Sequence, residues 1–183
     1  MIEREICIEP LAECHLSKAQ YFYSNYWYLR KYIIDKSKAY YDAKTGETKT
    51  FVVIDAGSED VAAYFSLKCS SLRVEEQIND DETEVNVYPT VEVVMFAVHS
   101  ALLRKNIGTR VLAHIINYVG ELRKKIGIRG ITLFSVPDAV DFYKKFSFKV
   151  LSEDLGMEMY RSTDCEECVP MYLALPELTD EEL

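Results

Sequence analysis

The pattern of hydrophobic and polar positions changes its period along the chain. Residues 17–41 contain neither Gly nor Pro, and apolar side chains recur at helical spacing at Phe22, Tyr26, Leu29 and Ile33. This spacing places one apolar stripe along a helix, so the segment predicts one long helix or two short ones.

Runs rich in β-branched and apolar residues surround this helical segment. Residues 5–11 are typical of a short first strand, and residues 48–55 and 61–72 are two strand-like runs separated by the hairpin sequence AGSED. The acidic stretch EEQINDDETE, residues 75–84, interrupts the pattern. We expect this stretch to be a solvated loop.

The second half of the chain has the sharper pattern. TVEVVMFAV, residues 90–98, is a continuous apolar run that indicates a central strand covered on both faces. A strand over 130–135, a short helix over 137–146 and closing strands over 148–151 and 169–175 follow. The helix after the central strand has one apolar face, made of Ile107, Val111, Leu112, Ile115, Val119, Leu122 and Ile126. This order predicts an α/β protein with a mixed sheet flanked by helices.

Length and composition place the chain among globular proteins. Its 183 residues suffice for one sizeable core, so we expect a single domain over residues 1–183. Hydrophobic residues make up 49% and charged residues 28%, and no apolar run approaches the roughly 18 residues of a membrane helix. The first residues lack the apolar core of a signal peptide, which favours a cytoplasmic protein whose five cysteines are reduced.

Charge and cysteine spacing each argue against a class of ligand. The net charge of −9 disfavours nucleic acid as a partner, because binding to phosphates needs a cationic surface, although basic residues cluster between 104 and 130. Cys165 and Cys168 in CEEC form too weak a pattern for a zinc site, which needs four ligands, so we expect no bound metal. A loop leading into the last strand is the simpler interpretation of this pair.

The segment VEVVMFAVHSALLRKNIGTRVL, residues 91–112, joins the central strand to the amphipathic helix. A tight turn at a helix start leaves several backbone N–H groups unpaired, and with the helix dipole they form a small anion site. Arg104 and Lys105 add positive charge, and Gly108 permits a close approach to the backbone. The alternative is an ordinary junction, in which both basic side chains are solvated and Gly108 serves only packing.

This segment resembles motif A of the GNAT superfamily of N-acetyltransferases, whose loop reads Gln/Arg-x-x-Gly-x-Gly/Ala. Leu103 stands at the Gln/Arg position, Asn106 at the first Gly and Gly108 at the second. DFYKKFSF, residues 141–148, is similar to the family's later FYxxxGF element, with Ser147 in place of its Gly. The terminal MYLAL resembles the family's last strand.

By this resemblance, the fold is a mixed, largely antiparallel sheet splayed open between the motif A strand and the next one, with acetyl-CoA in the gap. Phe96 and Val98 would offer backbone groups to the pantetheine arm. Asn106 can adopt the left-handed conformation that Gly favours, so the substitution weakens the motif without breaking it. The amides that would hold the diphosphate belong to Leu103, Arg104, Lys105, Asn106, Ile107, Gly108 and Thr109.

Acetyl transfer to an amine needs a base for the ammonium and an acid for the departing thiolate. Tyr143 matches the tyrosine that the family commonly uses as this acid; a buried structural tyrosine is the alternative. Glu92 is the base candidate, because some histone-type members carry a glutamate at the matching place; otherwise it points out at a strand edge or pairs with a lysine. His99 is a candidate proton relay or substrate ligand, or a surface cap.

The resemblance implies an acetyl-CoA-dependent N-acetyltransferase that acts on the primary amine of a small molecule, a protein Lys or a protein N-terminus. Two alternatives stay open: a toxin-like acetyltransferase of aminoacyl-tRNA, which the net charge of −9 disfavours, and a non-catalytic acyl-CoA-binding or assembly domain. The aromatic run YFYSNYWYLRKY, residues 21–32, either walls the acceptor groove or belongs to the core. Family members often pair through their last strands, which implies a homodimer.

Overall fold

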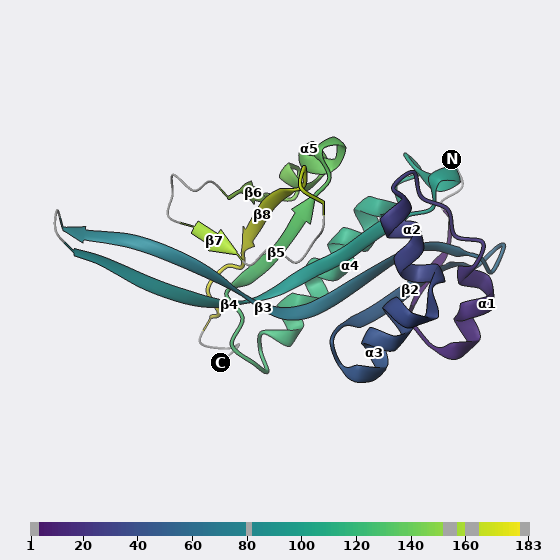
Figure 1. Ribbon diagram of the computed structural model, residues 1–183, viewed down its shortest axis with the longest axis horizontal. Helices are drawn as coiled ribbons and strands as arrows, with labels where there is room; N and C mark the ends of the chain where they lie inside the picture. The colour runs from purple at the N-terminus through teal and green to yellow at the C-terminus, as the bar shows by residue number, and fades with distance from the viewer. Residues whose placement is uncertain (1–3, 80–81, 152–156, 160–164, 180–183) are drawn as a thin grey trace. The chain divides into compact units, whose positions relative to one another are not determined.

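The computed structural model describes residues 4–79, 82–151, 157–159 and 165–179. A mixed, mostly antiparallel sheet is flanked by helices, which confirms the predicted fold class (Figure 1). The strands are β1 (Ile6–Pro10), β2 (Lys49–Asp55), β3 (Val61–Asn79), β4 (Glu82–Val98), β5 (Gly130–Ser135), β6 (Lys149–Val150), β7 (Met157–Met159) and β8 (Val169–Ala174). The α-helices are α1 (Leu16–Ala19), α2 (Trp27–Ile34), α3 (Tyr41–Thr45), α4 (Ile107–Leu122) and α5 (Val140–Lys144).

Two compact units share these elements. The first comprises Met1–Lys68 and Met95–His114, and the second comprises Cys69–Val94 and Ile115–Leu183. β3, β4 and α4 therefore each contribute residues to both units. The expectation of a single domain over residues 1–183 stays a prediction.

In the first unit, β1, β2 and the first part of β3 form an antiparallel ladder. Ile8 pairs with Val53, and Val52 pairs with Tyr64. Directly opposed residues project from the same face of a sheet, so Val52 and Tyr64 share a face. Both belong to the buried cluster of this unit, which also contains residues of α1 and α2. These two helices therefore cover this face of the sheet.

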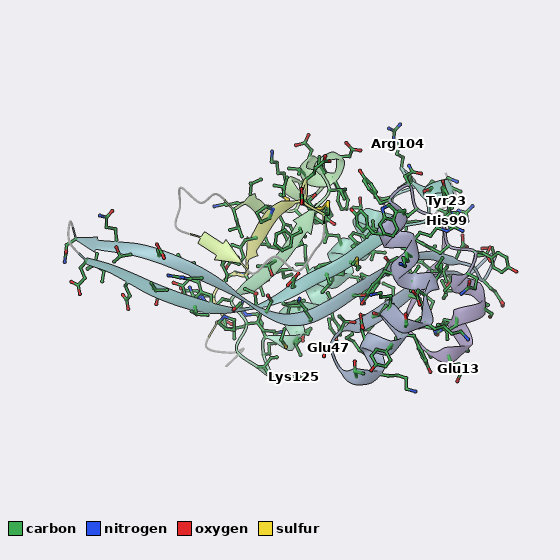
Figure 2. All side chains as sticks on the ribbon, in the orientation of Figure 1. Glu13, Tyr23, Glu47, His99, Arg104 and Lys125 are labelled. Atoms are coloured by element: carbon green, nitrogen blue, oxygen red, sulfur yellow. A yellow bond between two sulfur atoms is a disulfide. The ribbon has the colours of Figure 1, made fainter. Side chains whose placement is uncertain are left out.

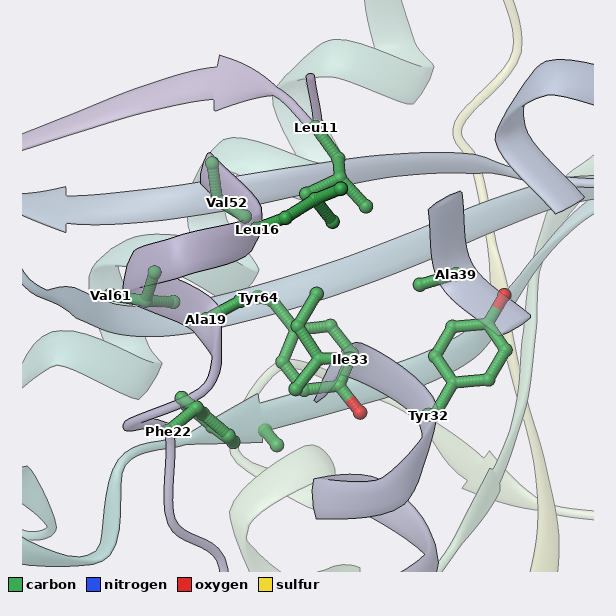
Figure 3. Close-up of a cluster of buried hydrophobic side chains, with 11 residues drawn as sticks. Leu11, Leu16, Ala19, Phe22, Tyr32, Ile33, Ala39, Val52, Val61 and Tyr64 are labelled. Atoms are coloured by element: carbon green, nitrogen blue, oxygen red, sulfur yellow. The ribbon is translucent and has the colours of Figure 1, made fainter. Parts of the chain in front are cut away.

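Figure 3 shows the hydrophobic core of the first unit. Tyr64 is fully buried there, with the Phe22 ring edge-on at 5.3 Å and the Tyr32 ring stacked at 6.3 Å between centroids. The Tyr64 hydroxyl donates a hydrogen bond of 2.5 Å to the Leu29 carbonyl oxygen of α2. Burial raises the pKa of Tyr64 well above its ordinary value, so the hydroxyl stays a donor and ties α2 to the sheet.

The segment predicted as one long helix or two short ones over 17–41 holds more and shorter pieces than either form of the prediction, and Phe22 and Tyr26 of the predicted stripe lie between α1 and α2. α1 ends at Ala19, whose carbonyl oxygen accepts the Phe22 N–H at 3.0 Å, and α2 begins several residues later. Asp35 ends α2 in an extended conformation, and its carboxylate accepts the Ser37 N–H at 2.9 Å. Such a local hydrogen bond competes with continuation of the helix. A π-helical turn (Lys36–Tyr40) then leads into α3.

In the second unit, β5 pairs with strands on both sides. Its residues 130–133 pair in parallel with residues 90–93 of β4, and the whole of β5 pairs antiparallel with β8. β6 pairs with β8, and β7 pairs with β3. β4 continues to Val98, so Phe96 and Val98, which we expect to contact the pantetheine arm, lie past the β4 residues of this ladder.

The acidic stretch over 75–84 is not the solvated loop that its composition suggests. Its described residues belong to β3 and β4, which form a two-stranded ribbon in the second unit (Figure 1). The Asn79 amide donates to the Glu82 carboxylate at 3.1 Å and ties the strand ends together. Val85 and Val87 alternate with polar residues on β4 and are exposed. The prediction was wrong because a strand with neither face buried can be rich in carboxylates, and its composition then resembles that of a loop.

The amphipathic helix predicted after the central strand is confirmed as α4. Leu122, its last residue, is half-buried, and Ile126 lies beyond the helix and is exposed. The apolar face is therefore shorter than the sequence predicts. Its buried residues are Ile107, Val111, Leu112, Ile115 and Val119.

Cysteine chemistry differs from the expectation at one place. Cys165 and Cys168 form a disulfide in the turn that precedes β8, whereas the sequence predicts reduced thiols. Cys7, Cys14 and Cys69 are free and exposed. Among the described residues, no group of His, Cys, Asp and Glu could hold a metal ion, and no helix has both the length and the hydropathy to cross a membrane.

Candidate functional site

The loop between β4 and α4 has the backbone conformation of an anion site. A 3-10 turn (Ser100–Leu102) follows β4, and α4 begins at Ile107. Arg104 and Asn106 both adopt left-handed conformations, with φ of 60° and 63°. The expectation that Asn106 takes the left-handed conformation is thus confirmed. A left-handed residue followed by a right-handed one turns successive N–H groups toward one side, which forms a concave anion-binding nest.

The first turn of α4 supplies further donors. The first hydrogen bond of this helix runs from the Arg110 N–H to the Asn106 carbonyl oxygen at 3.2 Å. The N–H groups of Ile107, Gly108 and Thr109 come before this bond, so the helix itself provides them with no acceptor. They point along the axis at the positive end of a 16-residue helix. Backbone N–H groups at the start of a helix in this arrangement are what a phosphate-binding loop requires.

Two basic side chains stand at this loop. The Lys105 ammonium donates to the Ala101 carbonyl oxygen at 3.0 Å, which keeps its charge beside the 3-10 turn. Arg104 is exposed, and Figure 2 shows its side chain extending outward from the first unit. Leu103 is exposed as well and contributes no polar side chain. Positive charge near the nest comes from side chains, and the nest itself comes from the backbone.

The segment between α1 and α2 is tied to the start of this loop. The Ser100 N–H donates to the Tyr23 carbonyl oxygen at 2.9 Å, and the Ser100 hydroxyl donates to the Asn25 side-chain oxygen at 3.2 Å. No sequence pattern indicates this contact, because the partners are far apart along the chain and neither belongs to a recognisable motif. The aromatic segment, for which the sequence left open a groove wall or a place in the core, therefore borders the loop between β4 and α4.

His99 caps the 3-10 turn after β4. Its Nδ1 accepts the Ala101 N–H at 3.2 Å, so the ring proton lies on Nε2 when the side chain is neutral. Its ring meets Phe22 edge-on at 5.7 Å. The interpretation of His99 as a cap is confirmed, and a role in proton relay stays a prediction.

A cavity of about 500 Å³ lies in the first unit beside this turn. His99 and Phe22 line it together with charged side chains from the N-terminal segment and from the turn between β2 and β3, among them Arg4, Asp55 and Asp60. The Arg4 guanidinium pairs with the Asp55 carboxylate, which also accepts the Gly57 N–H at 3.0 Å. This ion pair joins the N-terminal segment to the end of β2 on one side of the cavity.

Asp55 is buried, and burial by itself would raise its pKa. The Gly57 N–H and the Arg4 guanidinium outweigh that effect and hold the pKa of Asp55 below its ordinary value. Because the folded pKa is depressed, the stabilisation is present above the unfolded pKa and disappears as the pH falls through the folded pKa. We expect Asp55→Asn to lower the free energy of unfolding by about 1–3 kcal/mol at neutral pH, and by progressively less below about pH 4.

Urea titrations from pH 7 to about pH 2.5 measure this difference. Asp60→Asn is the matched control, because Asp60 belongs to the same turn and its side chain is exposed. An Asp55→Asn loss that stays constant over the whole pH range would mean that charge is not the source of the stabilisation.

The catalytic candidate Tyr143 lies on α5 in the second unit. Its side chain is 7% exposed and packs between Phe142 and Phe148, with ring centroids at 5.2 and 5.6 Å. The Tyr143 carbonyl oxygen accepts the Phe148 N–H at 3.3 Å, and Ser147 between them has a φ of 67°. This left-handed position explains why the family element has Gly where this chain has Ser.

Glu92, the base candidate, is only 1% exposed in the second unit. The alternative of a glutamate pointing into solvent at a strand edge is therefore wrong. Glu92 pairs with Thr132 of β5, and Thr90 and Thr132 lie with their hydroxyl oxygens 3.4 Å apart. By strand alternation Thr90 and Glu92 share a face, so the carboxylate lies among buried hydroxyls. Sequence patterns could not reveal this group, because each threonine alone is an ordinary strand residue.

The family to which this arrangement belongs follows from the sequence comparison. The profile of the acetyltransferase (GNAT) family matches residues 15–148, a range that includes the anion loop, Glu92 and Tyr143. The chain belongs to the GNAT acetyltransferase family. The predicted resemblance is thereby confirmed, as is the expectation of an acetyl-CoA-dependent acetyltransferase. No curated protein matches this GNAT acetyltransferase.

Solved structures share the fold of this GNAT acetyltransferase at low sequence identity. A bacterial toxin is 17% identical with a TM-score of 0.74, and the match covers 93% of this chain and 91% of the toxin. A tyrosine-to-phenylalanine mutant of the toxin AtaT, bound to the C-terminus of the antitoxin AtaR and acetyl-CoA, is 17% identical with a TM-score of 0.69 and 92% coverage of both chains. AtaT complexed with acetyl-methionyl-tRNAfMet is 17% identical with a TM-score of 0.68, covering 85% and 94%.

These structures bear on the partners expected from the sequence. AtaT has been solved with a tRNA and with a segment of an antitoxin, so proteins of similar fold bind nucleic acid and protein. That observation is in tension with the expectation, based on a net charge of −9, that nucleic acid is disfavoured as a partner. Net charge does not describe local charge, because residues 30–44 of this GNAT acetyltransferase carry five basic side chains and two carboxylates.

Proposed function

We propose that this chain transfers the acetyl group of acetyl-CoA directly to a primary amine. The observation that carries the proposal is the loop before α4, where left-handed residues and the first turn of the helix aim backbone N–H groups at one place. These residues fit a diphosphate, because the donors are backbone amides and Lys105 adds a cation. Acetyl-CoA would supply the activated thioester.

The amides of residues 103–109 hold the diphosphate in this proposal. Phe96 and Val98 on β4 provide backbone groups for the pantetheine arm in the manner of an added strand. Asn106 has the left-handed conformation for which the family uses Gly, which supports retention of the donor site despite the altered motif.

Tyr143 and Glu92 are the proposed acid and base. Glu92 accepts a proton from the acceptor's ammonium, directly or through water, and the neutral amine then attacks the thioester carbonyl. Tyr143 donates its hydroxyl proton to the thiolate that departs as the C–S bond breaks. A buried carboxylate among hydroxyls and a buried tyrosine on the family's later motif support these roles. AtaT and KacT, which have similar folds, have been solved as tyrosine-to-phenylalanine mutants.

The amine of an aminoacyl-tRNA is the acceptor that the comparisons favour. AtaT, of similar fold, has been solved with acetyl-methionyl-tRNAfMet. The excess of basic side chains over residues 30–44 gives the first unit a local positive charge that a tRNA acceptor needs. A small amine or a protein amine remains the other acceptor class.

Calorimetry with acetyl-CoA tests the donor site first. We expect acetyl-CoA to bind and free acetate not to bind, with 3′-dephospho-CoA reporting on contacts outside the diphosphate. Release of free thiol is then measured with polyamines, amino sugars, lysine peptides and aminoacylated tRNA as acceptors. No binding of acetyl-CoA would overturn the proposal, and binding without turnover on the whole panel would favour the non-catalytic alternative.

A further inference from the structure

The exposed face of α2 carries large aromatic side chains where a solvent-facing helix normally carries polar ones. Trp27 is 70% exposed, and Tyr23, just before the helix, is 49% exposed. The core interpretation of the aromatic run is correct for Phe22 and Tyr32, which are buried, and wrong for these two residues. Trp and Tyr are enriched at interfaces, because each combines a large apolar ring with a polar group.

Each of these rings has a basic partner. The Arg30 guanidinium lies over the Tyr23 ring at 5.4 Å from its centroid, and the Lys31 ammonium lies over the Trp27 ring at 5.7 Å. Trp27, Arg30 and Lys31 are spaced three and four residues apart, so they share one side of the helix. A ring that is 70% exposed cannot be covered on both faces, and the second face of Trp27 remains accessible.

The segment after α2 extends this positive charge. Lys36, Lys38 and Lys44 are all exposed. The two carboxylates of the segment have local partners: Asp35 accepts from Ser37, and Asp42 accepts from the Tyr32 hydroxyl at 3.1 Å. The two carboxylates thus form hydrogen bonds within their own segment, while the three lysine side chains are exposed to solvent.

The same surface lies next to the anion loop. Tyr23 and Ser100 are joined through their backbones at 2.9 Å, and Ser100 is the first residue of the 3-10 turn that leads into the loop. Figure 2 shows Tyr23, His99 and Arg104 at the same end of the first unit. A ligand held on α2 would therefore lie close to the place proposed for the acetyl donor.

We propose that Tyr23, Trp27, Arg30 and Lys31, the α2 surface, bind the single-stranded end of an RNA. Bases stack on the aromatic rings, and phosphates contact the two cations, since a single strand alternates planar rings and anions as this surface alternates aromatic and basic side chains. The inference rests on the aminoacyl-tRNA form of the proposed function and names the part of the chain that receives that acceptor.

Fluorescence anisotropy with a labelled single-stranded RNA of about 12 nucleotides tests the proposal without acetyl-CoA. We expect Trp27→Ala to weaken binding about tenfold. Arg30→Glu should weaken it and also reduce the salt dependence of the dissociation constant, because fewer counterions are released. A duplex of the same sequence should bind less tightly, since its bases are already stacked within the helix.

Matched variants separate this surface from general charge effects. Lys125→Glu removes an exposed cation of the second unit, and Tyr118→Ala removes an exposed ring of α4; both should bind RNA like the wild type. Thermal unfolding of all variants confirms that the fold is intact. The proposal is overturned if the α2 variants bind RNA normally, if the control variants lose as much, or if polyglutamate competes as well as RNA.

Failure of RNA binding at the α2 surface can be distinguished from failure of the proposed acetyl transfer. Acetyl transfer to small amines together with absent RNA binding would overturn the α2 surface and leave the acetyltransferase standing. RNA binding without any acetyl transfer would support the α2 surface and remove the proposed catalytic role.

Discussion

Tyr143→Phe is expected to lower kcat by about 100-fold to 10,000-fold while leaving the affinity for acetyl-CoA nearly unchanged. The hydroxyl is the proposed proton donor to the thiolate, so its loss affects the chemical step. Binding should survive, because the proposed diphosphate contacts are backbone amides of residues 103–109. Thiol release measures kcat, and calorimetry with acetyl-CoA measures the dissociation constant.

Tyr172→Phe is the matched control for this result. It removes a hydroxyl from the same unit, where Tyr172 donates to the Arg129 carbonyl oxygen at 3.3 Å, and should leave turnover intact. A wild-type rate for Tyr143→Phe would exclude that tyrosine from the mechanism.

Glu92→Gln in the same assay should lower the rate most at low pH, where the amine is protonated and needs a base. An unchanged pH–rate profile would place the base elsewhere.

The second large effect concerns the backbone of the anion loop. Asn106→Pro is expected to weaken acetyl-CoA binding by at least about 100-fold, because proline fixes φ near −65° whereas this residue has a φ of 63°. The change in backbone direction misaligns two or three N–H groups, and each charge-assisted hydrogen bond is worth about 1.5–3 kcal/mol. Calorimetry measures the loss, and thermal unfolding reports any cost to the fold.

Asn106→Gly is the opposite test of the same geometry. Glycine adopts positive φ without strain and restores the family's residue at this position, so binding should equal or exceed that of the wild type. If Asn106→Pro binds acetyl-CoA normally, the loop is an ordinary strand–helix junction and the donor site lies elsewhere.

Local rules were sufficient for the loop and its helix. The left-handed conformation of Asn106 and the start of α4 at Ile107 both follow from residue type and from apolar spacing. Ser147, at the position where the family element has Gly, has a φ of 67°, a conformation that Gly adopts readily. The helix start follows from apolar spacing in the sequence itself, whereas the special positions at Asn106 and Ser147 became apparent through the resemblance to the family's motifs.

Features that depend on distant contacts could not be predicted. The burial of Glu92 beside Thr132 requires the register between β4 and β5, which no local pattern specifies. The break after α2 has a local cause, the hydrogen bond from the Ser37 N–H to the Asp35 carboxylate, but apolar spacing alone does not indicate where such a bond forms. The exposure of Trp27 could not be predicted either, since helical spacing is the same for aromatic rings in a core and on a surface.

The ribbon of β3 and β4 has a consequence for how copies of the chain behave in concentrated solution. Val85 and Val87 are exposed on β4, and a strand of another copy could pair with the strand edges around them. Exposed apolar edges of this kind promote aggregation. Glu75, Glu82 and Glu84 stand beside them as gatekeepers whose like charges keep two ribbons apart. This protection is electrostatic, so it weakens as the pH approaches the isoelectric point near 4.9, and the protein is best concentrated well above that value.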